Sequence, residues 1–395
     1  MVRAIGSPQR LLIFNDTADL VGGAERGVLM MARRLDEAMF AVRFASFRDG
    51  IMARELAKSG IATCLLSAHP SILEPRNRLL YHPARSALFA RHLVHSGAVL
   101  ARHIRDSRIK LVYTYSTKGH LVSLAAAPWH DAVVVWDFRE LATPAWFVSV
   151  LSLLARSRVA AVFVQTRQAE VELARWFARS QIARVPNCID PDDPAFSSAA
   201  TDCSARSRLG LCGNRTVLIS AGRMSPLKGF DILIDAVKHV PDVETLICGG
   251  AEHEHERRYL EDCRNRARRA GISERVRFLG HRGDMSELIA ASDLAVSASR
   301  SEQQSRFIME AMLLKRPVIA TDVGGTREML RAPHGGWVVA PDSAPDLAAA
   351  IARLAKDERS RRELGERAHS LVCSHFSVGA HMAAKHELLG QLVHS

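Results

Sequence analysis

Two carboxylates in the second half of the chain have the types and spacing needed to bind a phosphorylated sugar. Glu302 precedes a predicted helix, and Glu310 lies within that helix eight positions later. A helical carboxylate can accept two hydrogen bonds from the hydroxyl groups of a ribose, and the free amides at the helix start can face a phosphate or a sugar. A strand and the turn Gly324-Gly325 follow. The segment therefore favours the binding of a nucleotide-sugar.

Two cations stand in an earlier loop that suits a diphosphate. A predicted strand ends at Gly222, and Arg223 and Lys228 follow, five positions apart, before a helix predicted from Gly229. Fixed cations can stabilise the negative charge of a departing diphosphate without a metal ion. Two exposed loop cations with no ligand are the alternative interpretation.

These residues are expected to lie on two α/β domains. A chain of 395 residues with 48% apolar content exceeds one ordinary core. Alternating strand and helix patterns predict parallel sheets covered by helices on both faces. Strands are predicted at residues 10–15, 42–46, 111–115, 133–137 and 160–165, and then at 216–221, 245–249, 276–280, 294–298, 318–321 and 337–339. We expect two Rossmann-like domains, 1–187 and 188–374, facing across a ligand-binding cleft, with a helix at about 375–395 returning to the first.

The positive charge lies in the first half. Up to Arg184 there are 25 Lys and Arg residues against 14 Asp and Glu, whereas the remainder holds 28 of each. Between Arg76 and Lys118, nine basic residues meet one acid, Asp106, with Leu and Val interleaved. Such a surface suits anionic lipid headgroups or a phosphorylated acceptor, and a solvated helix face is the alternative. Few aromatics and no recognisable binding module argue against nucleic acid as a partner.

The cysteines and the hydropathy indicate a cytoplasmic protein. Seven scattered cysteines contain no Cys-x-x-Cys pair, which fits reduced thiols and gives no zinc site. The first residues contain no long apolar run, and the longest apolar stretch, residues 144–155, is too short to span a bilayer. We expect a cytoplasmic location that allows peripheral contact with the inner face of the plasma membrane.

An ordered series of motifs resembles glycosyltransferase family 4, whose members are retaining enzymes of the GT-B fold. The series is Gly-Arg-x(4)-Lys-Gly-Phe-Asp from Gly222, Val-Arg-Phe-Leu-Gly-His-Arg from Val276, Glu-x(7)-Glu-Ala-Met from Glu302 and Pro-Val-Ile-Ala-Thr-Asp-Val-Gly-Gly-Thr-Arg-Glu from Pro317. Val-Gly-Gly-Ala-Glu-Arg from Val21 and Val-Pro-Asn-Cys-Ile-Asp from Val185 extend the resemblance over nearly the full length.

The resemblance implies a role for each matching residue. Arg223 and Lys228 would hold the donor pyrophosphate, Glu310 would bind the ribose, and Glu302 would contact the transferred sugar. Backbone groups would provide the remaining donor contacts: those of Gly222, of Gly280, His281 and Arg282 along the base, of Ser305, Arg306, Phe307 and Ile308 at the helix start, and of Gly22 and Gly23 from the first domain. At the last two positions, only a residue without a side chain would fit beside the phosphates. No metal or other cofactor is expected.

The chain departs from the family pattern at two places. Gln304 and Ser305 stand where relatives commonly have Phe-Gly, and Ser305 can still present its amide. Asp137 stands where the family often places a histidine near the reacting carbon. A carboxylate there can bond a sugar hydroxyl or stabilise positive charge at the anomeric carbon, so Asp137 joins Glu302, Arg223 and Lys228 as a predicted catalytic residue. His120 is a possible substitute for the histidine, with a surface histidine as the favoured interpretation.

The predicted function is retaining, metal-independent transfer of a sugar from a nucleoside-diphosphate donor to a glycan or lipid-linked acceptor. Assembly of cell-envelope polysaccharide, lipopolysaccharide or glycolipid is the expected context. A catalytically impaired nucleotide-sugar-binding or lipid-binding homologue is the alternative. A dinucleotide oxidoreductase is disfavoured, because neither Gly22-Gly23 nor Gly222 continues as Gly-x-Gly-x-x-Gly.

Overall fold

The computed structural model describes residues 7–19, 22–69, 72, 83–139, 153–201, 204–211, 213–331 and 334–394. Arg76 and Arg78 of the basic segment, Cys203, Cys212 and most of the apolar stretch 144–155 lie outside the described residues. None of the helices in the described part of the chain combines the length and the hydropathy that crossing a bilayer requires.

The chain forms two compact units. Unit 1 comprises Met1–Pro186 and His381–Ser395, and unit 2 comprises Asn187–Ala380. From the sequence we expect this boundary after residue 187 and the returning helix from about residue 375. The returning segment of the structure starts at His381 because the preceding residues bond within unit 2. There, the Ile189 amide donates to the Phe376 carbonyl over 2.9 Å, and the Val378 amide donates to the Ile189 carbonyl over 3.1 Å.

Unit 1 is built on one parallel sheet. Its strand order is β3-β2-β1-β4-β5-β6-β7, so the order reverses between β1 and β4. The strands are β1 (Gln9–Asn15), β2 (Phe40–Ser46), β3 (Ala62–Leu65), β4 (Leu111–Thr114), β5 (Val133–Phe138), β6 (Val159–Val164) and β7 (Ile182–Arg184). The helices are α1 (Gly23–Arg34), α2 (Ile51–Lys58), α4 (Pro83–Asp106), α5 (Thr117–Ala126), α7 (Arg167–Leu173) and most of α17 (Val378–His394).

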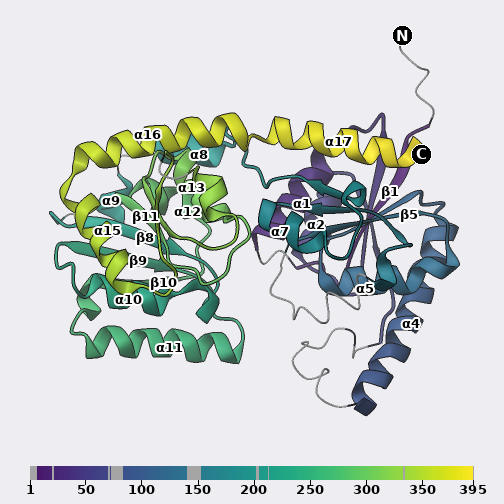
Figure 1. Ribbon diagram of the computed structural model, residues 1–395, viewed down its shortest axis with the longest axis horizontal. Helices are drawn as coiled ribbons and strands as arrows, with labels where there is room; N and C mark the ends of the chain where they lie inside the picture. Colours follow the sequence, from purple (N-terminus) through teal and green to yellow (C-terminus); the bar gives the residue numbers. More distant parts are fainter. Residues whose placement is uncertain are drawn as a thin grey trace, which may run out of the picture. The chain divides into compact units, whose positions relative to one another are not determined.

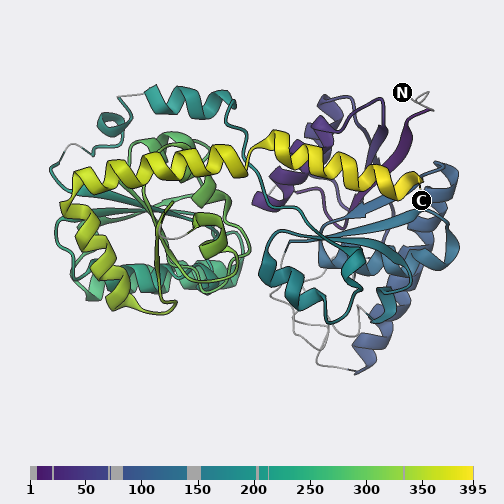
Figure 2. The same ribbon diagram turned by 45° about the horizontal axis from the view of Figure 1, so that its top comes forward.

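Alternate residues of the unit 1 strands enter different packing layers. On one face, Leu12, Phe14 and Val112 pack in a cluster with residues of α4 and α5. Trp136 belongs to a second cluster, which includes residues of α7. The intervening residues of β4 and β5 point to the opposite face, which α17 covers (Figures 1 and 2). Burial on both faces explains why these strands read as nearly continuous apolar runs.

Unit 2 repeats this architecture with six parallel strands. Their order is β10-β9-β8-β11-β12-β13, so the reversal falls between β8 and β11. The strands are β8 (Thr216–Ala221), β9 (Val243–Cys248), β10 (Val276–Gly280), β11 (Leu294–Ser297), β12 (Val318–Thr321) and β13 (Trp337–Val339). The helices are α8 (Pro194–Thr201), α9 (Ala205–Arg208), α10 (Phe230–Val237), α11 (Glu254–Arg269), α12 (Met285–Ala290), α13 (Arg306–Leu313), α14 (Thr326–Leu330), α15 (Ala344–Lys356) and α16 (Glu358–His375).

Two apolar layers enclose the unit 2 sheet. Val217 and Ile219 of β8 pack in the cluster that contains residues of α12, α13 and α16. Leu218 between them packs in the cluster that contains residues of α10, α11 and α15. Each unit thus has a doubly wound α/β fold, which confirms the predicted pair of Rossmann-like domains. Ligands of such sheets bind beyond the carboxyl ends of the strands where the order reverses.

Candidate functional site

An ion pair between two predicted site residues lies where the unit 2 strand order reverses. Lys228 ends a short 3₁₀ helix after β8, and Glu302 lies in the loop after β11. The Lys228 ammonium pairs with the Glu302 carboxylate, with side chains 26% and 15% exposed. A Cβ on Gly222 would lie 3.0–3.1 Å from the Lys228 side chain, so the missing side chain lets the lysine cross the end of β8. This arrangement places a cation and a carboxylate, both partly accessible, at the expected ligand position.

Two glycines at positive φ fix the loops that carry this pair. Gly229, which precedes α10, has a φ of 65°, and a Cβ there would lie 1.9 Å from the Ala298 carbonyl oxygen. Gly324 has a φ of 54°, and a Cβ there would lie 1.5 Å from the Glu302 carbonyl oxygen. The Gly325 amide also donates to the Gln303 carbonyl over 2.9 Å. The Gly-Gly turn therefore supports the backbone of the Glu302 loop.

The start of α13 presents backbone amides and a second carboxylate. Ser305 is the N-cap residue, and the side chains of Phe307 and Ile308 are buried in the core. The first amides of a helix have no partner within it and carry positive dipole character. Arg306 donates to Glu310 over 2.9 Å, and these side chains are 25% and 12% exposed. Glu310 is therefore held in a defined orientation and remains partly accessible.

The other predicted donor residues of unit 2 have two different environments. Arg223 is exposed and forms no ion pair with any residue that the structure describes. Gly280 ends β10 with a φ of 69°, and His281 beyond it is exposed. Arg282 donates to Asp284 through two nitrogens, over 2.8 and 2.5 Å. Hydrogen bonds from Arg282 lower the pKa of Asp284, and the same contact raises the pKa of Arg282. The Arg282 guanidinium is thus engaged within its own loop.

Gln304 connects the Glu302 loop to the interdomain linker. Its Oε1 accepts from the Asn187 amide over 2.6 Å, and its carbonyl accepts from the Asn187 side chain over 3.3 Å. A backbone amide can only donate, so this contact fixes which end of the Gln304 amide is the oxygen. A phenylalanine, which the family resemblance leads us to expect at this position, could not accept such a bond. The sequence marked the substitution but could not identify its partner.

The predicted Gly-Gly turn of unit 1 starts α1. Gly22 is the N-cap and Gly23 the first helical residue, and the Gly22 amide donates to the Glu25 carboxylate over 3.0 Å. The Gly22 φ of −143° is ordinary extended backbone. A Cβ there would meet only the Glu25 Oε2 at 3.2 Å, at the mobile end of a side chain. The described contacts therefore tolerate a side chain, and the need for glycine beside a phosphate stays a prediction.

Asp137 lies within a buried network of unit 1. Its side chain is 1% exposed, and it pairs with Arg139 at 2.7 Å and with Lys385 of α17 at 3.3 Å. Gln165 donates to its Oδ1 over 2.9 Å, and the Tyr113 hydroxyl donates to its Oδ2. Burial by itself would raise the pKa of Asp137, but Arg139 and Lys385 outweigh that effect and hold the pKa well below its usual range. The carboxylate is therefore ionised and surrounded by donors from its own unit.

His120 is buried, so the favoured interpretation of a surface histidine is wrong. Only 1% of the residue is exposed. Its Nδ1 lies 2.6 Å from the Thr114 hydroxyl, and its ring stacks on Trp136 with centroids 4.9 Å apart. The reason is the position of His120 in the first turn of α5, whose N-cap Ser116 follows β4 directly. Helices that follow a strand so closely turn their first residues onto the sheet.

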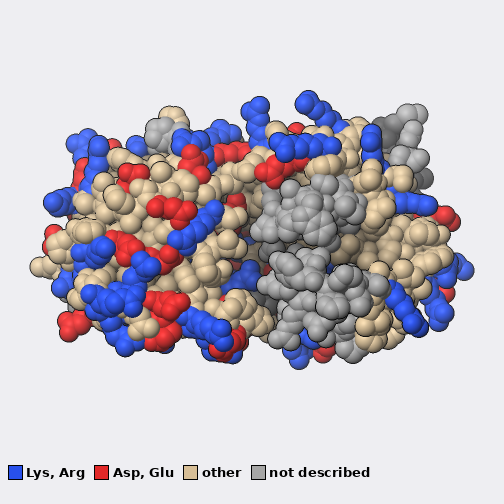
Figure 3. All heavy atoms as spheres, turned by 60° about the horizontal axis from the view of Figure 1, so that its bottom comes forward, with Lys and Arg blue, Asp and Glu red and all other residues tan. Residues whose placement is uncertain are grey.

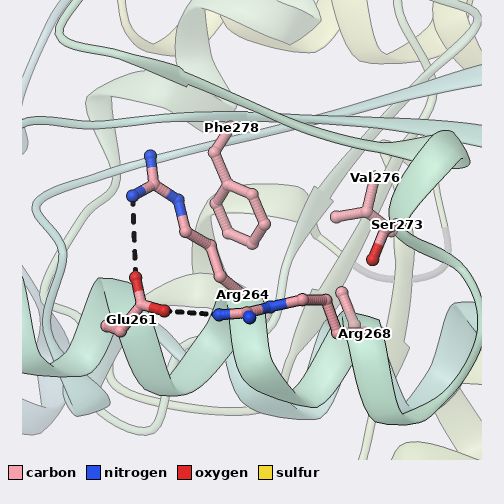
Figure 4. A pocket seen from close by; sticks show the side chains of 7 residues that line it. Glu261, Arg264, Arg268, Ser273, Val276 and Phe278 are labelled. Carbon is pink, nitrogen blue, oxygen red and sulfur yellow. Dashed lines mark hydrogen bonds and ion pairs between the residues drawn. The ribbon is translucent and has the colours of Figure 1, made fainter.

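A separate pocket in unit 2 contains none of the predicted site residues. It has a volume of about 280 Å³ and lies between α11 and the edge strand β10 (Figure 4). Its lining residues are Glu261, Arg264, Ala267, Arg268, Ser273, Val276 and Phe278. Both arginines pair with Glu261, Arg264 at 3.8 Å and Arg268 at 2.6 Å. Acidic and basic side chains alternate over the face of unit 2 that carries α11 (Figure 3).

The structure thus brings the predicted residues together in groups. Within unit 2, Gly222, Lys228 and Glu302 form one group, and Arg306 and Glu310 form another at the start of α13. Sequence reasoning missed Lys385, Arg139 and Asn187. The signal for Lys385 was a lysine on the apolar side of the last helix, which requires a buried counter-ion. No cluster of three or more His, Cys, Asp or Glu side chains suited to a metal ion occurs in the described ranges.

Comparison with known proteins shows which family and which structures the chain resembles. Residues 204–371 match the family model described as Glycosyl transferases group 1. Over 172 residues the chain is 31% identical to the lipopolysaccharide core biosynthesis glycosyltransferase LpsE of Rhizobium meliloti (strain 1021), covering 44% of this chain and 49% of that protein. The chain spans about half the length of the curated relatives it matches.

Solved structures extend the similarity to both units. A glycosyltransferase from Rickettsia africae ESF-5 matches with a TM-score of 0.81 at 20% identity, over 98% of this chain and 99% of that one. Anabaena Alr3699/HepE in complex with UDP-glucose matches with a TM-score of 0.81 at 23% identity, over 97% and 99%. Residues 204–371 are therefore similar to the group 1 glycosyl transferases, and the chain has the two-domain GT-B fold that the motif series implied.

Proposed function

We propose that this protein transfers a sugar, with retention of anomeric configuration, from a nucleoside-diphosphate donor to an acceptor hydroxyl. The observation that carries the proposal is the meeting of Lys228 and Glu302 where the unit 2 strand order reverses. The start of α13 follows Glu302 closely and contributes amides and Glu310. A diphosphate needs cations and amide donors, and a ribose needs a hydrogen-bond acceptor. The loops at the carboxyl ends of these strands provide a cation, amide donors and a carboxylate acceptor.

In the proposed reaction, Arg223 and Lys228 bind the diphosphate and stabilise the charge that grows on it as the sugar departs. Fixed cations that face a developing charge lower the barrier because they are already oriented. The departing phosphate oxygen takes the proton of the acceptor hydroxyl on the same face of the sugar. Glu302 bonds the transferred sugar, and Glu310 bonds the ribose. Since the two cations neutralise the leaving group, we propose that the reaction requires no metal ion.

A panel of nucleotide-sugars tests the proposal. The donor should raise the melting temperature by mass action, and it should be hydrolysed or transferred in the presence of a chelator. Uridine-diphosphate sugars come first, because a protein of the same fold was solved with UDP-glucose. Stabilisation by a nucleoside diphosphate with no turnover of any donor would exclude the enzymatic function.

The second candidate is a protein that binds nucleotide-sugars or lipids without transfer. The burial of Asp137 favours this alternative, because the carboxylate at the family's histidine position is not accessible. The two candidates differ in turnover and not in binding. A donor-hydrolysis assay with a chromatographic readout of the free nucleoside diphosphate therefore distinguishes them.

We propose that the acceptor is anionic or lipid-linked and that unit 1 contacts an anionic membrane surface from the cytoplasmic side. This proposal is supported by one exposed face of α4, which is mainly basic. Its exposed residues include Leu88, Arg91, His95, Arg102 and Arg105. These positions recur at helical spacing, so they form one stripe that can lie along charged headgroups. A relative named for lipopolysaccharide core biosynthesis supports an acceptor of the cell envelope.

Liposome flotation tests this contact. The protein should float with vesicles that contain anionic lipid, and it should stay in the bottom fraction of the gradient when the vesicles are neutral. The variant Arg91→Glu/Arg102→Glu should lose flotation, whereas Arg258→Glu/Arg359→Glu, on exposed helix faces of unit 2, should retain it. Equal flotation of both variants, or indifference to lipid charge, would remove this part of the proposal.

A further inference from the structure

A carboxylate, two cations, a phenol and an amide form a closed network inside unit 1. Asp137 and Lys385 are each 1% exposed, and the Arg139 side chain is 6% exposed. Asp137 and Lys385 are far apart in the sequence, since Asp137 is the last residue but one of β5 and Lys385 lies in the last helix. A buried charge is costly unless it is paired and hydrogen-bonded, so each member depends on the others.

Both oxygens of Asp137 are engaged by neighbouring side chains. Gln165 donates to Oδ1 over 2.9 Å. Arg139 donates to Oδ2 through Nε over 3.0 Å and Nη2 over 2.7 Å, and Tyr113 also donates to it. With 1% of its side chain exposed and donors on both oxygens, Asp137 is poorly accessible to a sugar hydroxyl.

Lys385 closes the network from α17. Its ammonium lies 3.3 Å from Asp137 Oδ2 and donates to the Tyr113 hydroxyl over 2.7 Å. It also lies over two aromatic rings, 4.8 Å from the Tyr113 centroid and 4.4 Å from that of Phe163. Such contacts favour a cation and add to the pairing with the carboxylate. The last helix is thereby fixed to β4, β5 and β6.

Arg139 connects the network to α1. Its Nη1 lies 3.3 Å from the position that a Cβ on Gly27 would occupy, so the guanidinium packs directly on that glycine. Gly27 lies one turn after Gly22 and Gly23, which start the helix. The orientation of Arg139 is set by its two bonds to Asp137. The network thus extends from the last helix to the helix that carries the predicted phosphate-facing turn.

We propose that Asp137 is a positioning residue, which holds Arg139 against α1 and receives Lys385 from α17, and that it makes no contact with the sugar. This inference rests on the proposed function for its effect on turnover, but not for its effect on stability. In this proposal, the Asp137 carboxylate compensates the buried positive charges of unit 1.

The test is a double-mutant cycle with Asp137→Asn and Lys385→Met. Asp137→Asn leaves two buried cations without a carboxylate and should lower the melting temperature of unit 1 by on the order of 10 °C. Lys385→Met leaves Asp137 and Arg139 as a matched pair and should shift the midpoint by a few degrees at most. The double variant removes one cation and keeps an acceptor for Arg139, so it should regain at least half of the loss.

Turnover distinguishes positioning from direct contact. Asp137→Asn should raise the donor KM and lower kcat, and the double variant should regain most of both. A double variant that regains the melting temperature but not kcat would show that Asp137 acts on the substrate and would overturn the proposal. A double variant that melts no higher than Asp137→Asn, or does not fold, would overturn it as well. If the wild-type protein turns over no donor, the proposed function fails while the stability cycle still decides the pairing.

Discussion

The two units share one architecture but differ in how they hold an ion pair near the carboxyl ends of their strands. In unit 2, Lys228 and Glu302 are 26% and 15% exposed. In unit 1, Lys385 and Asp137 are 1% exposed each, and further donors surround the carboxylate. From the sequence we predict a catalytic role for Glu302 and for Asp137 alike. The difference in exposure indicates that the first pair can be opened by a ligand and the second cannot.

The physical reason lies in the cost of separating the partners. A partly solvated lysine loses little when a phosphate replaces its carboxylate, because the phosphate supplies the same charge and water solvates the released glutamate. A buried pair that is opened leaves an uncompensated charge in a medium of low dielectric constant. In the proposed function, pairing in unit 2 would keep Lys228 oriented before the donor binds, whereas we expect pairing in unit 1 to maintain the fold.

The largest expected effect tests the accessible pair. Lys228→Ala should lower kcat by roughly two to four orders of magnitude, because the charge on the leaving diphosphate loses a fixed cation. The melting temperature should change little, since the pair is partly exposed. Lys238→Ala is the control, as this lysine pairs with Asp235 at 3.9 Å on another surface of unit 2. Wild-type turnover by the Lys228 variant, measured by release of the nucleoside diphosphate, would exclude the assigned role.

A second prediction concerns the ribose contact at the start of α13. Glu310→Ala should weaken donor binding by about 10-fold to 100-fold, because a charged acceptor of two hydroxyl hydrogen bonds is lost. A donor analogue without ribose hydroxyls should bind the variant and the wild type equally. Glu363→Ala is the matched control, since Glu363 accepts from Arg359 four positions away over 2.9 Å, as Glu310 does from Arg306. Equal losses for both variants in calorimetric titrations would contradict a specific contact.

Most strands could be predicted because both faces of each sheet are buried. The predicted bounds of β8, β10, β12 and β13 are those that the structure has, and apolar residues predominate in each of these strands. Two strands were missed. Side chains of the edge strand β3 (Ala62–Leu65) are mostly exposed, so no apolar run marks it. β7 (Ile182–Arg184) has only three residues, which is too short for a periodic pattern.

The site residues differ in how far sequence could place them. Lys228, Glu302 and Glu310 lie within one continuous motif series, so spacing located them on their loops and helix. The surroundings of Asp137 depend on Lys385, which is 248 positions away in the chain. No local pattern reports that contact. Sequence therefore located the acid at the end of β5 but could not show that its charge is already balanced.

A third prediction tests the backbone support of the accessible pair. Gly324→Ala should destabilise unit 2 by at least about 2 kcal/mol and lower kcat, since the new Cβ would collide with the Glu302 carbonyl and move its loop. Gly213→Ala, where a Cβ would meet nothing within 4 Å, should stay within about 0.5 kcal/mol of the wild type. Denaturant unfolding and steady-state kinetics measure the two effects. A Gly324 variant with unchanged stability would show that the turn yields without cost.

A fourth prediction concerns the pH dependence of stability in unit 1, where the buried pair lies. His381 of α17 contacts the Pro186 carbonyl through Nδ1 at 2.7 Å, and burial, with Lys385 nearby, lowers its pKa to about 3. The unfolded chain binds a proton at this histidine near pH 6.5, so stability should rise with pH between about 3 and 6.5. The slope from this group is at most about 1.4 kcal/mol per pH unit. The lowered pKa of Asp137 acts at lower pH, because its contribution is lost only as the pH falls below about 4, so the two contributions overlap only between about pH 3 and 4.

The variant His381→Asn isolates this contribution. Asparagine can still donate to the Pro186 carbonyl but has no titrating ring. Denaturant unfolding of the variant between about pH 4.5 and 6.5 should therefore show a smaller rise in the free energy of unfolding than that of the wild type. Equal slopes would mean that His381 takes up its proton in the folded state, which requires water to reach α17 beside Lys385. The buried and accessible pairs would then differ less than their exposed fractions indicate.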